Sequence, residues 1–93
     1  MNNINLKKIE EKLWTGYVKF DELPPVVQFE IIDQSLKRVA ENLIIKYGNN
    51  LDDDIILKIA KGYINRNIYV YGDTIKDVSI MYKLLLEKYQ SLI

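Results

Sequence analysis

The chain has 93 residues, 48% of them hydrophobic and 28% charged, and its 13 basic side chains balance 13 acidic ones. These values indicate one folded domain over residues 1–93 and exclude an intrinsically disordered chain, which would need low hydrophobicity and a large net charge. The sequence contains no histidine and no cysteine, so it lacks disulfides, thiol chemistry and the side chain that most often performs acid–base catalysis near neutral pH.

The N-terminal segment predicts a short helix over residues 4–14, followed by a stop at Gly16, since glycine readily adopts a left-handed cap conformation. The apolar side chains at helical spacing are Leu6, Ile9 and Leu13. Trp14 either covers the core or marks an interface, and its place beside Leu13 favours the core. Charged side chains interrupt every early apolar run, so we expect no signal peptide and no membrane span. The lack of cysteine favours a cytoplasmic protein.

Residues 25–47 predict the clearest helix. Pro24-Pro25 suits its start, where a missing N–H costs little, and Gly48 suits its end. The apolar side chains between them follow a 3-4-3-4 spacing at Phe29, Ile32, Leu36, Val39 and Leu43. This pattern is typical of a helix that packs along its length on another helix. The preceding residues 17–20 are β-prone and predict a short extended segment.

The third predicted helix begins near Leu51 and has two alternative ends. Asp52–Asp54 supply the negative charge that a helix cap and first turn favour. The apolar stripe consists of Ile56, Ile59, Ala60 and Tyr63. The helix ends either at Gly62 or at Arg66, and residues 67–72 then form either a short strand or an aromatic connector.

The last predicted helix spans residues 74–92, with Thr74 and Asp77 at capping-box spacing. Its apolar side chains are Ile75, Val78, Tyr82, Leu85, Tyr89 and Leu92. Because it resembles the helix over 25–47, we expect these two long helices to pack antiparallel at a shallow angle. The predicted fold is mainly α, a three- to four-helix bundle, with or without a minor two-stranded β-ribbon that pairs residues 17–20 with 68–71.

The sequence offers no recognisable catalytic motif. Its four scattered glycines form no phosphate-binding loop, and its serines lie in predicted helices rather than in a nucleophile elbow. Asp52–Asp54 is the one dense acidic run, and helix capping is favoured there over a protein-facing patch of Asp53 and Asp54 and over a metal site. We therefore predict no enzyme, no cofactor and no metal ion.

The candidate partner-binding residues are Arg66, Tyr69, Tyr71, Asp53 and Asp54. Tyr69 and Tyr71 share one side of a segment expected to be extended, near Arg66, and tyrosine and arginine are enriched at binding hot spots. Aromatic side chains beside a basic residue can also stack single-stranded bases. The competing interpretation, that both tyrosines cover the end of a small core, is favoured.

The stretch Tyr17–Pro24, with Val27 and Gln28 in the following helix, resembles the openings of small phage and mobile-element proteins. The resemblance implies an accessory regulator or inhibitor, a class that includes anti-CRISPR proteins, and it assigns no functional residue. We expect a protein-interaction module that binds another protein or forms a homodimer through surplus apolar surface. The alternative is a nucleic-acid accessory protein that uses the Arg66–Tyr71 connector, which the balanced charge disfavours.

Overall fold

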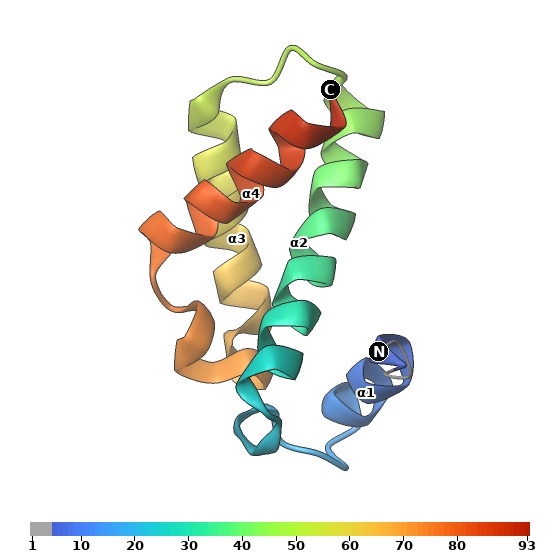
Figure 1. Cartoon of the computed structure of the whole chain (residues 1–93). Helices are drawn as coiled ribbons and strands as arrows, with labels where there is room; N and C mark the ends of the chain where they lie inside the picture. Colours follow the sequence, from blue (N-terminus) through green and yellow to red (C-terminus); the bar gives the residue numbers. More distant parts are fainter. Residues whose placement is uncertain (1–4) are drawn as a thin grey trace.

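The computed structural model describes residues 5–93, which fold into four α-helices joined by short connections (Figure 1). The α-helices are α1 (Leu6–Trp14), α2 (Pro25–Tyr47), α3 (Asp53–Tyr71) and α4 (Val78–Leu92). Two 3-10 turns, η1 (Phe20–Glu22) and η2 (Gly72–Ile75), precede α2 and α4. The mainly helical fold class is therefore confirmed. Residue 4, where the first helix was expected to begin, lies outside the described residues.

The expected β-ribbon between residues 17–20 and 68–71 is wrong, because residues 5–93 contain no strand. Residues 68–71 instead form the last turn of α3. The N–H of Gly72, which has a φ of 65°, donates to the carbonyl of Ile68 and ends the helix. The N–H groups of residues 68–71 are thus used within the helix and cannot form a strand ladder with a second segment.

α3 is longer than either predicted end allows, since it continues through Gly62 and past Arg66 to Tyr71. Ile64 and Tyr71 are buried and lie two helical turns apart on the core-facing side. Their burial in a continuous helix outweighs the β propensity of the residues between them, because tertiary packing routinely overrides local preference.

α2 and α3 run antiparallel, and α4 crosses one face of this pair and packs against both helices (Figure 1). The hydroxyl of Tyr89 donates to the Gly48 carbonyl (2.7 Å) and accepts from the Leu51 amide (3.2 Å). α4 therefore ends beside the end of α2, and the two helices run in the same general direction. The expected antiparallel pairing of residues 25–47 with 74–92 is wrong, because α3 is itself a long helix that reverses the chain once more.

α4 begins at Val78 rather than at Thr74. Asp77 is the N-cap residue, and its Oδ1 accepts a hydrogen bond from the Ile80 amide (3.3 Å). The expected capping box is therefore replaced by a cap from Asp77 alone. The preceding turn η2 buries Ile75 completely, which adds an apolar side chain to the core before α4 starts.

The core lies where α4 meets α2 and α3. Its largest fully buried side chains are Tyr63, Tyr71, Ile31, Leu36, Ile56, Ile75 and Leu85. Phe29, which was expected on the apolar seam of α2, is 71% exposed. It lies in the first turns of α2, which α4 does not cross (Figure 1). Val27 and Ile31 in the same turns are buried, so this part of α2 turns a different face to the core and leaves Phe29 in solvent.

One polar pair is buried between α2 and α3. The hydroxyl of Tyr63 donates to the Oγ of Ser35 at 3.0 Å. Burial is the main cause that raises the pKa of Tyr63, and burial also raises the pKa of Tyr71. Both phenols must therefore stay protonated in the folded state, where an ionised phenolate would lie largely out of water.

These shifts predict alkaline destabilisation. A tyrosine whose pKa is raised by folding contributes its full stabilisation below the unfolded-state pKa of about 10, and loses it as the pH rises above that value. We expect the free energy of unfolding, measured by urea titration, to fall between about pH 9.5 and about pH 11. Tyr63→Phe removes one of the two groups and should flatten this pH dependence. An unchanged slope in that variant would contradict the assignment.

Candidate functional site

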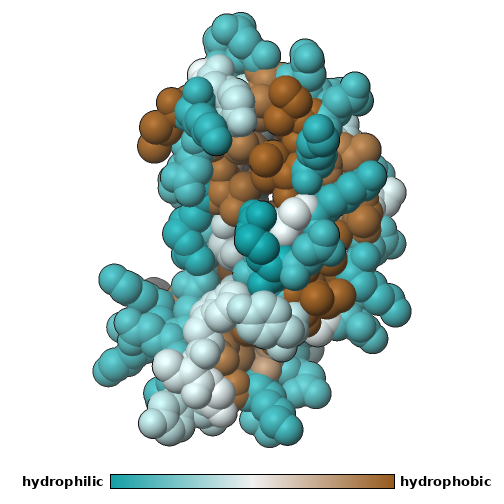
Figure 2. Space-filling view, turned by 180° about the vertical axis from the view of Figure 1, so that it is seen from behind, coloured by the Kyte–Doolittle hydropathy of each residue, from teal (hydrophilic) through white to brown (hydrophobic). Residues whose placement is uncertain are grey.

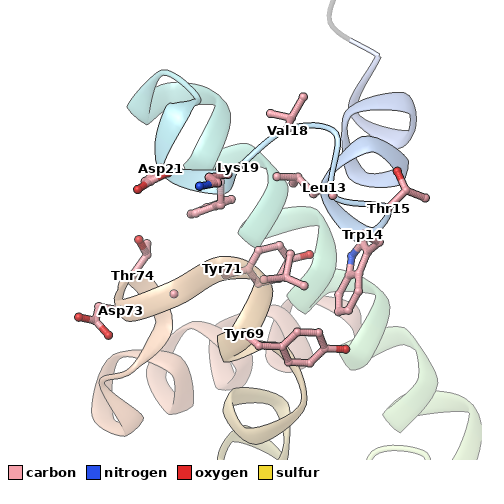
Figure 3. Close-up of a pocket in the computed structure, with 14 residues that line it drawn as sticks. Leu13, Trp14, Thr15, Val18, Lys19, Asp21, Tyr69, Tyr71, Asp73 and Thr74 are labelled. Carbon is pink, nitrogen blue, oxygen red and sulfur yellow. The ribbon is translucent and has the colours of Figure 1, made fainter.

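A groove of about 790 Å³ separates two segments that are far apart in the sequence (Figure 3). One wall is the connection from the end of α1 to η1, within residues 13–21, and the other is the end of α3 with η2, within residues 69–74. Its volume falls within the range of ligand-binding clefts. The segments expected to pair as a ribbon thus lie on opposite walls of a groove, without strand hydrogen bonds.

The first wall is held by bonds back to α1. The amide of Thr15 donates to the Glu11 carbonyl (3.0 Å), and its hydroxyl donates to the same oxygen (2.7 Å). Gly16, with a φ of 85°, reverses the chain, so that the amide of Tyr17 donates to the Lys12 carbonyl (2.9 Å). The groove wall therefore begins at a closed helix end rather than in a free loop.

The same wall is also fastened to α2. The side-chain amide of Gln28 donates to the carbonyls of Phe20 (3.1 Å) and Leu23 (2.9 Å). The Lys19 amide donates to the Glu22 carboxylate (3.3 Å). These bonds satisfy backbone groups between two helices and restrict the motion of the wall.

Four aromatic rings form the floor and one rim of the groove. Phe20 and Tyr71 are buried, with ring centroids 5.1 Å apart. Trp14 packs edge-on against Tyr71 (6.2 Å) and Tyr69 (5.6 Å). Trp14 remains 44% exposed and Tyr69 75% exposed. The buried rings therefore support two rings that still present much of their surface to solvent.

The charged side chains lie toward the other end of the groove, away from Trp14 (Figure 3). They include one cation, Lys19, and two carboxylates, Asp21 and Asp73. Asp73 is 4.0 Å from the Nζ of Lys76, in an exposed ion pair. Since burial raises the pKa of the Tyr71 hydroxyl, the floor stays neutral at physiological pH. The groove is thus apolar at one end and mixed in charge at the other.

α1 reaches this position through a contact with α2. The guanidinium of Arg38 lies 2.7 Å from the Glu10 carboxylate. This hydrogen bond is the largest cause that raises the pKa of Arg38. The pair joins α1 to α2 just behind Trp14, so it helps to place the tryptophan at the groove.

The structure does not bring all three predicted residues, Arg66, Tyr69 and Tyr71, to one site. Two residues apart on a helix, Tyr69 and Tyr71 point about 200° away from each other rather than to the same side. Tyr71 is buried, as the core interpretation expected, whereas Tyr69 is exposed. The guanidinium of Arg66 folds back along α3 and lies 3.1 Å from the position of a Cβ added to Gly62. Tyr69 and Tyr71 therefore line the groove, and Arg66 does not.

Asp53 and Asp54 lie in the first turn of α3, at the end opposite the groove. Their separation from Tyr69 along the helix is more than about 20 Å. The helix dipole favours carboxylates at this position. Desolvation, followed by the nearby carboxylate of Asp53, raises the pKa of Tyr82. Within residues 5–93, no three acidic side chains are arranged to hold a metal ion.

Sequence reasoning missed Trp14 as a groove residue, because it favoured the core for this side chain. The sequence feature that indicated an exposed side chain is the position of Trp14 at the last residue of α1, directly before a helix stop. The charged residues Lys19, Asp21 and Asp73 carried no such signal, since the first two lie at the start of η1 and the third lies in η2, far later in the sequence.

Comparison of the chain with family models, curated proteins and solved structures gives no match. Within the described residues, none of the helices has the combined length and apolarity of a membrane span.

Proposed function

We propose that this chain is a non-catalytic protein-interaction module that binds a segment of a partner protein in the groove between residues 13–21 and 69–74. The observation that carries the proposal is the exposure of Trp14 and Tyr69 above a packed aromatic floor. Tryptophan and tyrosine are enriched at binding hot spots, and rings that are already held in place lose little conformational freedom on binding. An apolar side chain of the partner would cover both rings.

The mixed charge of the groove supports a protein partner over a nucleic acid. Nucleic-acid binding needs several cations that neutralise phosphates, whereas the groove offers Lys19 against Asp21 and Asp73. Arg66 lies outside the groove and Tyr71 is buried. Of the three residues expected to contact a nucleic acid, Arg66, Tyr69 and Tyr71, only Tyr69 remains as an exposed stacking surface at this site.

A cytoplasmic regulator or inhibitor is the role we propose for such a module. The lack of cysteine supports a reducing compartment. The resemblance of the Tyr17–Pro24 opening to phage and mobile-element proteins supports a regulatory or inhibitory partner contact. Both proposals depend on binding at the groove, which can be measured directly.

Trp14 is the only tryptophan of the chain, so its fluorescence reports on the groove. We would select peptides on the whole protein from a random displayed library and titrate the enriched peptides while recording tryptophan emission. We expect a saturable change in emission. Tyr69→Ala should weaken binding by at least about tenfold, because truncation of a hot-spot aromatic costs more than 1 kcal/mol.

Ile45→Ala is the matched control, since Ile45 is 83% exposed on α2 and does not line the groove. It should leave the affinity unchanged. A selection that yields no peptide, or peptides whose binding is indifferent to Tyr69→Ala, would contradict the proposal. Salt-sensitive binding of a single-stranded oligonucleotide with the same emission change would favour the nucleic-acid alternative instead.

A further inference from the structure

α4 covers only one face of the α2–α3 pair. Figure 2 shows apolar side chains gathered over the upper half of the opposite face, in the region bordered by the end of α2 and the start of α3. Half-buried apolar residues of these segments include Val39, Leu51, Ile55 and Ile59, with Tyr47 exposed at 39%. This surface is separate from the aromatic groove, whose lining in α3 begins at Tyr69.

One line of side chains runs along α3 on this face, and we name it the α3 stripe. It consists of Asp52, Ile55, Ile59, Gly62 and Arg66. Their 3-4-3-4 spacing places them on one side of a helix. The buried Ile56, Ala60, Tyr63 and Ile64 mark the core-facing side, and Tyr63 lies only about 40° around the helix from Ile59. Ile59 therefore packs one edge against the core and is half-buried, as are Ile55 and Gly62. The stripe is thus a helix face that the rest of this chain leaves partly uncovered.

The charges on the stripe are placed symmetrically. Asp52 lies seven positions before Ile59 and Arg66 seven positions after it, so the two charges are about 21 Å apart along the axis. Both are exposed, and within residues 5–93 neither takes part in an ion pair. A second α3 that runs antiparallel, with its Ile59 opposite Ile59, brings each Asp52 to the Arg66 of the other copy. The stripe is therefore complementary to itself.

Gly62 in the middle of the stripe supports a close neighbour. Glycine in a helix interior is destabilising relative to alanine, so its presence calls for a reason. Among residues 5–93, and apart from the adjoining backbone of α3 itself, only the flexible end of Arg66 comes within 4 Å of a Cβ added at Gly62, with its nearest nitrogen at 3.1 Å. A second helix could approach the α3 backbone at this point more closely than over any side chain.

We propose that the α3 stripe is a self-association surface, on which a second copy of this chain packs its own α3 antiparallel about Ile59. Such an interface is isologous: the same patch serves both copies, and the symmetric order of charges is the pattern that a two-fold axis requires. The two Asp52–Arg66 pairs at its ends select the antiparallel register, and the isoleucines between them supply apolar burial. This proposal does not rest on the groove, and either can fail without the other.

The test is sedimentation equilibrium of the full chain at increasing concentration. We expect a monomer–dimer equilibrium for the unchanged chain, and a shift toward monomer of at least about tenfold in dissociation constant for Ile59→Lys. Ile45→Lys, on the outer side of α2, is the control and should dimerise normally. A chain that stays strictly monomeric at about 1 mM, a concentration that would populate even a weak dimer, overturns the proposal.

A charge exchange keeps the test valid if Ile59→Lys fails to fold. Asp52→Lys and Arg66→Asp should each raise the dissociation constant, because each places like charges opposite one another. The double variant restores both pairs and should return the constant to within about threefold of the original. Circular dichroism checks that each variant keeps the overall helix content of the unchanged chain. A double variant that associates no better than the single variants overturns the register.

Discussion

Tyr71→Ala should lower the free energy of unfolding by about 3–5 kcal/mol, the usual loss for removing a large buried aromatic side chain. Tyr71 is only 2% exposed and contacts the rings of both Phe20 and Trp14. It therefore links the end of α3 to the connection between α1 and α2. Its loss should open a cavity at the groove floor and release the wall above it. Urea unfolding followed by circular dichroism measures the effect.

Tyr69→Ala is the matched control, because it removes the same side chain from the same helical turn. Tyr69 is largely exposed, so we expect a loss of less than about 1 kcal/mol. Tyr71→Phe removes the hydroxyl but keeps the ring, so it distinguishes the contributions of the two. It should retain most of the stability that the Tyr71→Ala variant loses. Equal losses for Tyr69→Ala and Tyr71→Ala would show that the aromatic floor does not hold the connection in place.

The contrast between Tyr69 and Tyr71 also explains why the expected orientation of both side chains to one side was wrong. In an extended segment, alternate residues share a face, and both tyrosines would point the same way. In the helix that forms, Tyr71 continues the buried side that contains Ile64, and Tyr69 faces outward. Local β propensity could not reveal this, because the helix depends on burial of Tyr71 against Phe20 from another part of the chain.

The bounds of α2 could be predicted from local signals. The expected range of residues 25–47 coincides with α2, which starts at Pro25 and ends before Gly48 with a φ of 68°. Proline at the first helical position and glycine beyond the last act through their own backbone preferences, so a sequence reveals them. The relative direction of α2 and α4 was not accessible in this way, because it follows from the length of α3.

For the groove, the sequence could predict only that its two walls lie close together. The sequence suggested that residues 17–20 and 68–71 lie close together, and they do contribute to opposite walls of the groove. What it could not show was that η1 and the bonds of Gln28 hold the first segment away from strand geometry. Trp14 became a rim residue for the same reason, since its exposure depends on where α1 packs.

Leu85→Ala should produce the other large loss of stability, about 2–5 kcal/mol. Leu85 is completely buried at the middle of α4, the helix that packs against both α2 and α3. α4 buries only Met81, Leu85 and Tyr89 fully along its length. Truncation of Leu85 therefore removes apolar contact where α4 crosses α2 and α3. The side chains around the resulting cavity cannot move toward one of these helices without losing contact with the other, so the cavity stays largely unfilled. For a domain of this size, we expect the melting temperature to fall by about 10 °C or more.

Two other positions on α4 provide matched controls for this substitution. Ile80→Ala and Leu92→Ala remove side chains that are 51% and 38% exposed, and each should cost less than about 1 kcal/mol. If Leu85→Ala unfolds the chain outright, Leu85→Met keeps the side-chain volume and should cost less than about 1.5 kcal/mol. A loss for Leu85→Ala no larger than that for Ile80→Ala would contradict the arrangement in which α4 joins α2 to α3, since a helix that packed on only one of them could adjust to the missing side chain.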